Sequence, residues 1–247
     1  MNREQISRIA HADHPIAAPV DDDAVRRLLE RGVPHDRDAR ALDLGCGGGE
    51  WLLRALAAHP RLRAEGVDNS EAALAHARTR ARACGVDDRL TLHHENAGDF
   101  TAPSPFDLVL SVGASHAHGG LLPTLAAARA HLAPGGHVLV GDGFWEREPT
   151  PEAVEMLGGL SDLPTTLDEV VAAGWTPVQG HISTRGELDA YEWSWTGSLA
   201  AWALDHPADP DGAQALEAAT LHRAQWLRTY RDSFGFVCLL LRRTAER

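Results

Sequence analysis

From residue 39 onward, short apolar runs alternate with segments in which apolar residues recur at helical spacing. The run FDLVLSV at Phe106–Val112 is continuous in apolar character, as is typical of a strand buried on both faces. Strands that alternate with helices in this way predict right-handed βαβ units and a parallel sheet. The predicted strands are Ala39–Leu44, Arg63–Val67, Leu90–His94, Phe106–Val112, His137–Val140, Trp175–Ile182 and Phe234–Leu241.

Helix boundaries are predicted from capping residues, glycines and turn-rich breaks. Ser70 is placed to cap one helix, and either Thr165 or Thr166 to cap another. The stretch LAPGG at Leu132–Gly136 is predicted to be a turn before the fifth strand. The predicted helices are Ala24–Arg31, Glu50–Ala58, Ser70–Cys84, Leu121–Leu132, Thr165–Ala173, Glu187–Leu204 and Gly212–Tyr230.

The sharpest feature is the sequence ALDLGCGGGE at Ala41–Glu50, where a predicted strand meets a predicted helix. Gly45, Gly47 and Gly49 lack a Cβ, so a ligand can approach the backbone closely and positive φ is permitted. The N–H groups and the positive end of the following helix point into the same space. Asp43 precedes the loop, where its carboxylate can accept hydrogen bonds from loop amides or from a bound ammonium group.

An acidic residue, Asp68, ends the second predicted strand. A carboxylate at this place can accept hydrogen bonds from both hydroxyls of a ribose. The plainer interpretation is a tight turn followed by a solvated acid, but the context around both parts favours a nucleotide-type site. Two ligand classes remain, dinucleotides and S-adenosylmethionine. The run G-x-G-x-G departs from the dinucleotide fingerprint G-x-G-x-x-G, and the anionic Glu50 that follows disfavours a pyrophosphate.

Charge and composition exclude several classes of function. The chain has 23 Lys+Arg against 35 Asp+Glu, a formal net charge of −12, and all of its cations are arginine. Without lysine there is no Schiff-base, pyridoxal-phosphate or P-loop lysine chemistry, and the negative balance argues against a nucleic-acid partner. No apolar run approaches the roughly 20 residues of a membrane-spanning helix, and Met1–Ala10 is too polar for a secretory signal. With 3 widely spaced cysteines, we expect a cytoplasmic protein without a disulfide framework and without a membrane partner.

Taken together, these motifs resemble those of a class I S-adenosylmethionine-dependent methyltransferase of the small-molecule type. The sequence DLGCGGG at Asp43–Gly49 matches the first motif of that family, D-x-G-x-G-x-G. Phe106–Val109 resembles its F-D-x-V motif, and Leu132–Gly136 resembles its L-x-P-G-G turn. ENAGDF at Glu95–Phe100 falls where the family contacts adenine. The resemblance covers about residues 39–142.

The resemblance implies a fold, a cofactor and a set of binding residues. The implied fold is α/β: a Rossmann-like, mostly parallel, seven-stranded sheet of order 3-2-1-4-5-7-6 with an antiparallel last strand, helices on both faces and a helical cap inserted near the C-terminus. The implied cofactor is S-adenosyl-L-methionine, which leaves S-adenosyl-L-homocysteine as product. The adenine contact is assigned to Asn96, with Asp99 as the competing register. The implied cofactor-binding residues are Asp43, Gly45, Cys46, Gly47, Asp68, Asn69, Asn96, Ala97, Asp99 and Val112.

Two loops, 113–120 (GASHAHGG) and 141–147 (GDGFWER), follow the fourth and fifth predicted strands and are expected to flank the transferred methyl group. Methyl transfer is an in-line displacement, so positioning of the acceptor is the main task. An oxygen or nitrogen acceptor that must lose a proton also benefits from a base. His116 is the first candidate for this base, with Asp142 or Glu146 as the second. The alternative is that His116 only lines the pocket.

Residues predicted to contact the acceptor are His14, His118, Tyr191 and Trp195. The segment that contains His14 either folds over the cofactor or is an ordinary surface loop. Alternate aromatic residues of the sequence YEWSW point to one side if this segment is extended, whereas Tyr191 and Trp195 share a face with Trp202 if it is helical. Aromatic side chains there would suit a flat, apolar or cationic acceptor. The other interpretation is that they pack the helices onto the sheet.

We therefore predict methyl transfer from S-adenosylmethionine to an oxygen or nitrogen atom of a small molecule, in a monomer or homodimer of bacterial origin. The histidine pairs of the chain fit no common zinc signature, so no metal is expected. The alternatives are an NAD(P)-dependent oxidoreductase and a non-catalytic S-adenosylmethionine-binding protein. A single domain over 1–247 is predicted, with an N-terminal cap segment 1–38, a cofactor-binding core 39–142, a substrate and cap region 143–233 and a final strand 234–242.

Overall fold

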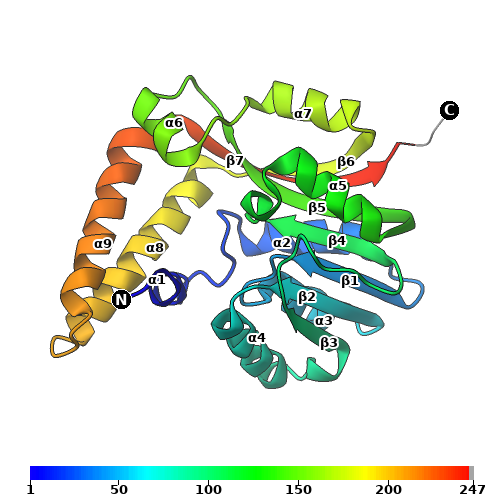
Figure 1. Cartoon of the computed structure of the whole chain (residues 1–247), viewed down its shortest axis with the longest axis horizontal. Coiled ribbons are helices and arrows are strands. Elements are labelled where there is room, and N and C mark those ends of the chain that lie inside the picture. The colour runs from blue at the N-terminus through cyan, green and yellow to red at the C-terminus, as the bar shows by residue number, and fades with distance from the viewer. Residues whose placement is uncertain (245–247) are drawn as a thin grey trace. The chain divides into compact units, whose positions relative to one another are not determined.

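A computed structural model describes residues 1–244 of the chain (Figure 1). The chain divides into two compact units, which we call the sheet unit and the helical unit. The sheet unit consists of Asp21–Asp142, Thr166–Ile182 and the described residues from Val237 onward, and the helical unit consists of Met1–Val20, Gly143–Thr165 and Ser183–Phe236.

A seven-stranded sheet has the order β3-β2-β1-β4-β5-β7-β6. Its first five strands pair in parallel, and β6 pairs with β7 in the antiparallel direction. The predicted fold class and strand order are confirmed. The strands are β1 (Ala39–Leu44), β2 (Leu62–Asp68), β3 (Leu90–His94), β4 (Phe106–Val112), β5 (Leu132–Trp145), β6 (Trp175–Ile182) and β7 (Phe234–Arg243).

Helices cover both faces of this sheet because the connections run in two directions from its centre (Figure 1). The chain moves from β1 to β2 and β3 toward one edge, and from β4 to β5 toward the other, so right-handed crossovers place the helices on opposite faces. The helices of one face are α2 (Asp22–Gly32), α3 (Glu50–Ala58) and α4 (Glu71–Ala83), while α5 (Leu121–His131) lies on the other face. This winding brings the carboxyl ends of β1 to β4 to one edge of the sheet, where ligands bind in such folds.

The fifth strand is longer than the sequence predicts. Phe106 pairs with Leu132 and Leu108 pairs with His137, so an advance of two residues along β4 matches an advance of five along β5. The predicted LAPGG turn is therefore a bulge inside the strand. Beyond the predicted end of the strand at Val140, β5 continues to Trp145 because its apolar residues Phe144 and Trp145 are buried. The predicted loop 141–147 is therefore strand for most of its length.

The start of α7 (Leu163–Ala172) also differs from the prediction. The carboxylate of Asp162 accepts a hydrogen bond from the backbone N–H of Thr165 at 2.8 Å. Asp162 therefore caps the helix, and Thr165 and Thr166 lie within it. An acidic side chain just before the first turn is favourable because it faces the positive end of the helix.

The helical unit is built from helices that lie outside the sheet. The YEWSW segment lies within one of them, α8, so its helical alternative is the correct one. A core of mostly small side chains, including Ala203, Ala215 and Ala219, lets three of the helices pack closely: α1 (Arg3–Ala10), α8 (Arg185–Asp205) and α9 (Gly212–Gln225). The unit also contains α6 (Pro151–Leu157), and α9 is extended by the π-helical turn η3 (Trp226–Tyr230).

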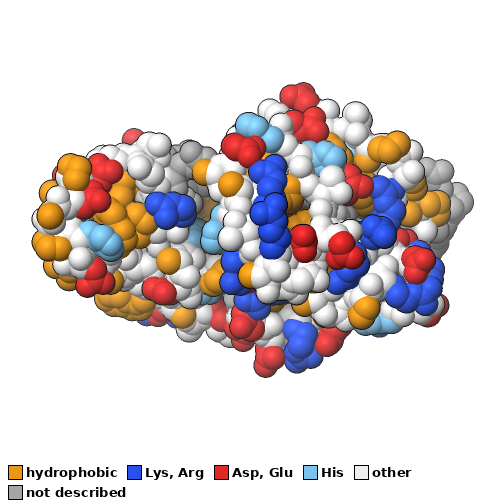
Figure 2. All heavy atoms as spheres, turned by 90° about the horizontal axis from the view of Figure 1, so that it is seen from below, with side chains coloured by type: hydrophobic (Ala, Val, Ile, Leu, Met, Phe, Trp, Pro, Cys, Tyr) orange, Lys and Arg blue, Asp and Glu red, His pale blue; other side chains and the backbone are white. Residues whose placement is uncertain are grey.

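The surface of the helical unit carries several exposed apolar side chains. Figure 2 shows such side chains on the part of the surface formed by α8 and α9. Those on α8, α9 and η3 are Trp193, Leu204, Leu216, Leu221 and Leu227. In the described part of the chain, no helix combines the length and apolar character needed to cross a membrane.

Candidate active site

The glycine loop between β1 and α3 has a conformation that only glycine adopts easily. Gly45, Gly47 and Gly49 have φ angles of 92°, 49° and 74°. The N–H groups of Gly45 and Cys46 both donate to the carbonyl of Val67 on β2, at 2.9 and 3.0 Å. Apart from its chain neighbours, no residue in the described range 1–244 has an atom within 4 Å of the place that a Cβ on Gly47 would occupy, so the space above this backbone is open.

Asp68 joins the loop to the end of β2. One carboxylate oxygen accepts from the N–H of Gly47 at 2.8 Å, and the other accepts from the N–H of Ser70 at 2.8 Å. A carboxylate has about four acceptor positions, so two remain for the hydroxyls of a ligand. The predicted association of the glycine loop with Asp68 is therefore present in the structure.

Buried acidity is the main electrostatic feature here. Burial, and then the neighbouring Asp68, raise the pKa of Asp43 to about 7. Burial and the same two carboxylates raise the pKa of the Cys46 thiol well above its ordinary value, so the thiol stays protonated and is a poor nucleophile. A cationic ligand placed beside Asp43 and Asp68 would relieve the repulsion between them.

Two small residues that the sequence analysis did not single out shape the loop. A Cβ on Gly66 would lie 2.8 Å from Sγ of Cys46, so β2 needs glycine where the loop crosses it. A Cβ on Gly45 would lie 2.6 Å from Cβ of Ala114, which follows β4. Gly66 could have been recognised from the sequence, because it is a glycine inside a strand, two residues before an acid. No feature of the local sequence indicates the role of Ala114.

The turn after β3 adjoins the same edge. The N–H of Glu95 donates to the carbonyl of Asp68 at 3.1 Å, and Oδ1 of Asn96 accepts from the N–H of Gly98 at 2.9 Å. Asn96 and Asp99 are exposed, whereas Ala97 between them is buried. Asn69 and Val112 are the remaining predicted cofactor contacts, directly after β2 and at the end of β4.

Comparison with known proteins identifies the kind of site. A family model described as a methyltransferase domain matches residues 42–138. The crystal structure of a SAM-dependent methyltransferase from Geobacter sulfurreducens in complex with S-adenosyl-L-homocysteine is 25% identical, with a TM-score of 0.86, and the match covers 97% of this chain and 98% of that one. YjhP of Escherichia coli is 26% identical over 96% of this chain and 97% of its own length. Trans-aconitate 2-methyltransferase of Streptomyces avermitilis is 36% identical over 52% of this chain and 46% of its own length, about half of each.

The region that the family model matches begins in β1 and ends in β5, so it contains the glycine loop, Asp68 and the turn after β3. The chain belongs to the class I S-adenosylmethionine-dependent methyltransferases. This confirms the resemblance stated from the motifs. The cofactor of the methyltransferase is S-adenosyl-L-methionine.

The candidate base His116 lies in the short helix η2 (Ser115–His118), which follows β4 in the sheet unit. Its side chain is exposed. His118 is half-buried, burial lowers its pKa, and its Nε2 is buried without a hydrogen-bond partner among the described residues. Asp142, predicted in a loop, lies within β5 and is half-buried.

The other candidates belong to the helical unit. The carboxylate of Glu146 accepts a hydrogen bond from the guanidinium of Arg185. The hydroxyl of Tyr191 lies 3.2 Å from Nε2 of His11, and the ring of His14 meets the Tyr191 ring edge-on with centroids 5.4 Å apart. Trp195, one turn further along α8, stacks on a histidine of α9. Two groups of aromatic and imidazole side chains are thus assembled on α8.

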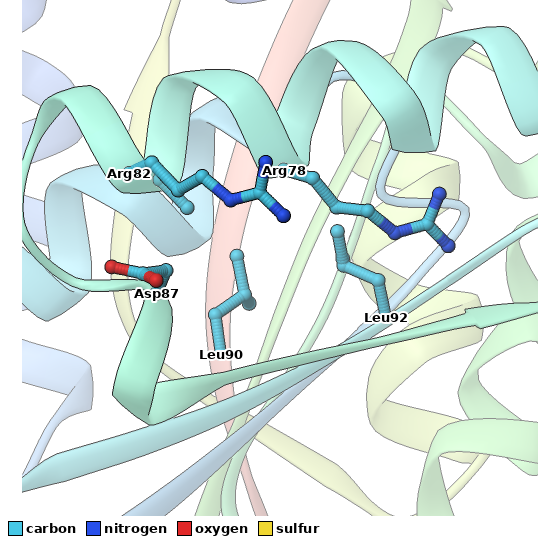
Figure 3. Close-up of a pocket in the computed structure, with 6 residues that line it drawn as sticks. Arg78, Arg82, Asp87, Leu90 and Leu92 are labelled. Atoms are coloured by element: carbon cyan, nitrogen blue, oxygen red, sulfur yellow. The ribbon is translucent and has the colours of Figure 1, made fainter.

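A separate pocket lies between α4 and β3 (Figure 3). Arg78 and Arg82 extend from successive turns of α4 over Leu90 and Leu92 of this edge strand. Arg78 also pairs with a glutamate of its own helix. The aliphatic parts of the arginines shield the leucines from water, and none of the predicted site residues lines this pocket. Within residues 1–244, no group of three or more His, Cys, Asp or Glu side chains is arranged to hold a metal ion.

Proposed function

We propose that the methyltransferase binds S-adenosylmethionine at the carboxyl ends of β1 to β4 and transfers its methyl group to an oxygen or nitrogen atom of a small molecule. The observation that carries the proposal is the hydrogen bond from the Gly47 N–H to the Asp68 carboxylate. It holds the glycine loop and the strand-end acid together beside an open backbone surface.

Each part of this edge has a role in the proposal. Asp68, with Asn69 after it, holds the ribose hydroxyls, since two acceptor positions of the carboxylate are unused. The backbone of Gly45, Cys46 and Gly47 lies against the cofactor, and the buried carboxyl of Asp43 lies near its ammonium end. Asn96 or Asp99 contacts the adenine edge, with Ala97 and Val112 providing apolar contact.

The cofactor supplies a methyl group that is already activated on a sulfonium, so the chain mainly has to position the acceptor. His116 accepts the proton that an oxygen or nitrogen acceptor loses, since a neutral imidazole suits this task near neutral pH. It is favoured over Glu146, whose carboxylate is held by Arg185. Asp142 remains the second candidate within the sheet unit.

A small acceptor is supported by two observations. The formal net charge of −12 disfavours a nucleic-acid partner. Trans-aconitate 2-methyltransferase, which matches about half of the chain, acts on a small organic acid according to its name. We infer that the acceptor is likewise a small molecule, bound with the help of His14, His118, Tyr191 and Trp195.

Calorimetry with S-adenosylhomocysteine tests the cofactor site. We expect Asp68→Ala to weaken binding by about 1–3 kcal/mol, since it removes a charged hydrogen-bond acceptor. The matched control is Asp38→Ala, which removes an exposed acid paired with Arg61, and its dissociation constant should equal that of the wild type. An unchanged dissociation constant for Asp68→Ala would reject the assignment of the ribose to this residue.

Two further measurements separate the alternatives. Binding of NAD in place of S-adenosylhomocysteine would favour an oxidoreductase. Transfer of tritiated methyl from S-adenosylmethionine into the small-molecule fraction of a bacterial extract tests for turnover. Binding without any transfer would favour a non-catalytic S-adenosylmethionine-binding protein.

A further inference from the structure

A polar cluster within the helical unit joins Glu192 of α8 to His222 of α9 and Tyr230 of η3. One oxygen of the Glu192 carboxylate accepts from the Tyr230 hydroxyl at 2.8 Å, and the other lies 2.7 Å from Nε2 of His222. The Glu192 side chain is only 12% exposed, so its charge is held by these two donors rather than by water. Tyr230 is also buried.

These contacts fix the proton on the imidazole ring of His222. An ionised carboxylate only accepts hydrogen bonds, so Nε2 of His222 must carry a proton. The Tyr230 hydroxyl donates to Glu192 and therefore has no proton to give to the ring. In the neutral ring, Nδ1 then holds a lone pair, and no hydrogen bond to Nδ1 is found among residues 1–244. The geometry thus produces an oriented hydrogen-bond acceptor.

The ring is also fixed in its plane. The indole of Trp195 stacks on His222, with centroids 4.0 Å apart and an angle of 25° between the planes. The π-helical turn η3 places Tyr230 beside Glu192, and such turns are frequent at functional sites. Yet the His222 side chain is 31% exposed, more than the carboxylate that it covers. A purely structural ion pair would not require a partly exposed ring whose second nitrogen has no hydrogen bond within the described chain.

We propose that the Glu192–His222–Tyr230 cluster is a binding site for the methyl acceptor, in which Nδ1 of His222 accepts a hydrogen bond from a hydroxyl or N–H group of the acceptor. The proposal rests on the proposed function, because it identifies the bound molecule as the methyl acceptor. Glu192 and Tyr230 are positioning residues, which hold the imidazole in the required tautomer. Trp195 is a positioning residue too, because its indole stacks on the imidazole and holds the plane of the ring.

Nuclear magnetic resonance of the full chain with nitrogen-15-labelled histidine tests the site without relying on turnover. We expect His222 to be protonated on Nε2 and unprotonated on Nδ1 at pH 8. Phenol, a flat probe with a hydroxyl donor, should shift the Nδ1 resonance, whereas anisole, which lacks the donor, should not. The opposite tautomer, equal shifts by both probes, or no shift by either would overturn the proposal.

The chain offers a matched control within the same unit. His206 also stacks on a tryptophan, Trp202, with centroids 5.0 Å apart, but its ring pairs with a backbone carbonyl and, in the described part of the chain, with no carboxylate. The Nδ1 resonance of His206 should be indifferent to phenol. In the Glu192→Gln variant the response of His222 to phenol should weaken, because a neutral amide no longer imposes one tautomer.

Measurement of methyl transfer provides a second test of the proposed acceptor site. With tritiated S-adenosylmethionine and the small-molecule extract, we expect His222→Gln to raise the half-saturating amount of extract about 5- to 10-fold, the loss of one hydrogen bond. Its maximal rate should change less, and its affinity for S-adenosylhomocysteine should not change. His206→Gln should behave as the wild type.

The two failures are distinguishable. If the wild type transfers methyl and His222→Gln has the same half-saturation, the acceptor site is wrong while the proposed function stands. If the wild type transfers no methyl, the proposed function fails, and the identification of the ligand as a methyl acceptor fails with it. Unchanged binding of S-adenosylhomocysteine by His222→Gln shows that the variant is folded.

Discussion

The two units of this methyltransferase build their polar sites in different ways. In the sheet unit, the backbone makes the site: glycines with positive φ turn the loop, and the Gly47 N–H meets the Asp68 carboxylate. In the helical unit, side chains make it, since Glu192 is joined to His222 and Tyr230 across 30 and 38 positions of the chain. A backbone site depends on local residue types and is visible in the sequence. A side-chain site depends on helix packing and is not.

The largest expected effect tests the backbone site. Gly45→Ala places a Cβ 2.6 Å from that of Ala114, on a backbone with a φ of 92°. We expect a loss of about 4 kcal/mol in the free energy of unfolding, from strain and overpacking together, and no measurable binding of S-adenosylhomocysteine. Urea denaturation and calorimetry measure the two effects.

Gly85→Ala is the control for strain alone. Gly85 has a φ of 66°, but nothing lies within 4 Å of its Cβ position. We expect this variant to lose only about 1 kcal/mol and to bind S-adenosylhomocysteine as the wild type does. Equal losses for both glycines would mean that close packing against Ala114 does not shape the loop.

The next effect concerns the buried acid of the sheet unit. Because the pKa of Asp43 is raised to about 7, the folded state keeps a proton that the unfolded state loses near pH 4. The stability of the wild type should therefore fall as the pH rises from about 4 to 7, and Asp43→Asn should remove this fall. We expect the variant to gain roughly 2–4 kcal/mol on the wild type between pH 4 and pH 8.

Urea denaturation at a series of pH values measures this difference. Asp38→Asn, at an exposed ion pair, should show no such pH-dependent gain in stability relative to the wild type. If the difference between Asp43→Asn and the wild type were the same at every pH, Asp43 would not titrate abnormally. Neither burial nor the neighbouring Asp68 would then raise the pKa of this carboxyl.

The smallest effect tests the side-chain site of the helical unit. Tyr230→Phe removes a hydrogen bond to a carboxylate, and Tyr191→Phe removes the contact with the imidazole of His11. We expect losses of roughly 2 and 1 kcal/mol in the free energy of unfolding, since hydrogen bonds to charged groups are the stronger ones. Thermal or urea denaturation measures them. Neither variant should alter the affinity for S-adenosylhomocysteine, and a large change in that affinity would mean that the effect of the substitution is not confined to the helical unit.

Much of the sheet unit could be predicted because its signals are local. The strand Ala39–Leu44, the helix Glu50–Ala58 and the cap at Ser70 have the predicted bounds or roles. Each depends on a short apolar run, a glycine or a capping side chain. The association of the glycine loop with Asp68 could be predicted too, because parallel strands bring their carboxyl ends to one edge.

The errors occur where neighbours in space override a local signal. Pro134 and two glycines indicate a turn, yet pairing with β4 keeps the chain in the sheet as a bulge. The helix predicted at Glu187–Leu204 is not one of these errors, and packing of α8 against α1 and α9 selects the helical alternative for its YEWSW segment. Asp142 was predicted in a loop but lies in β5. The strand is extended by the burial of Phe144 and Trp145, and this burial depends on the tertiary structure.

The sequence alone determined the α/β class, the identity of the cofactor and the acid that meets the glycine loop, because glycine spacing and strand-end residues act through the local backbone. Only the tertiary structure decided that Asp43 keeps its proton to about pH 7. It also decided that Glu192 holds His222 and Tyr230. Burial and long-range hydrogen bonds depend on the environment that each side chain has in the folded protein. They cannot be predicted from residue type alone.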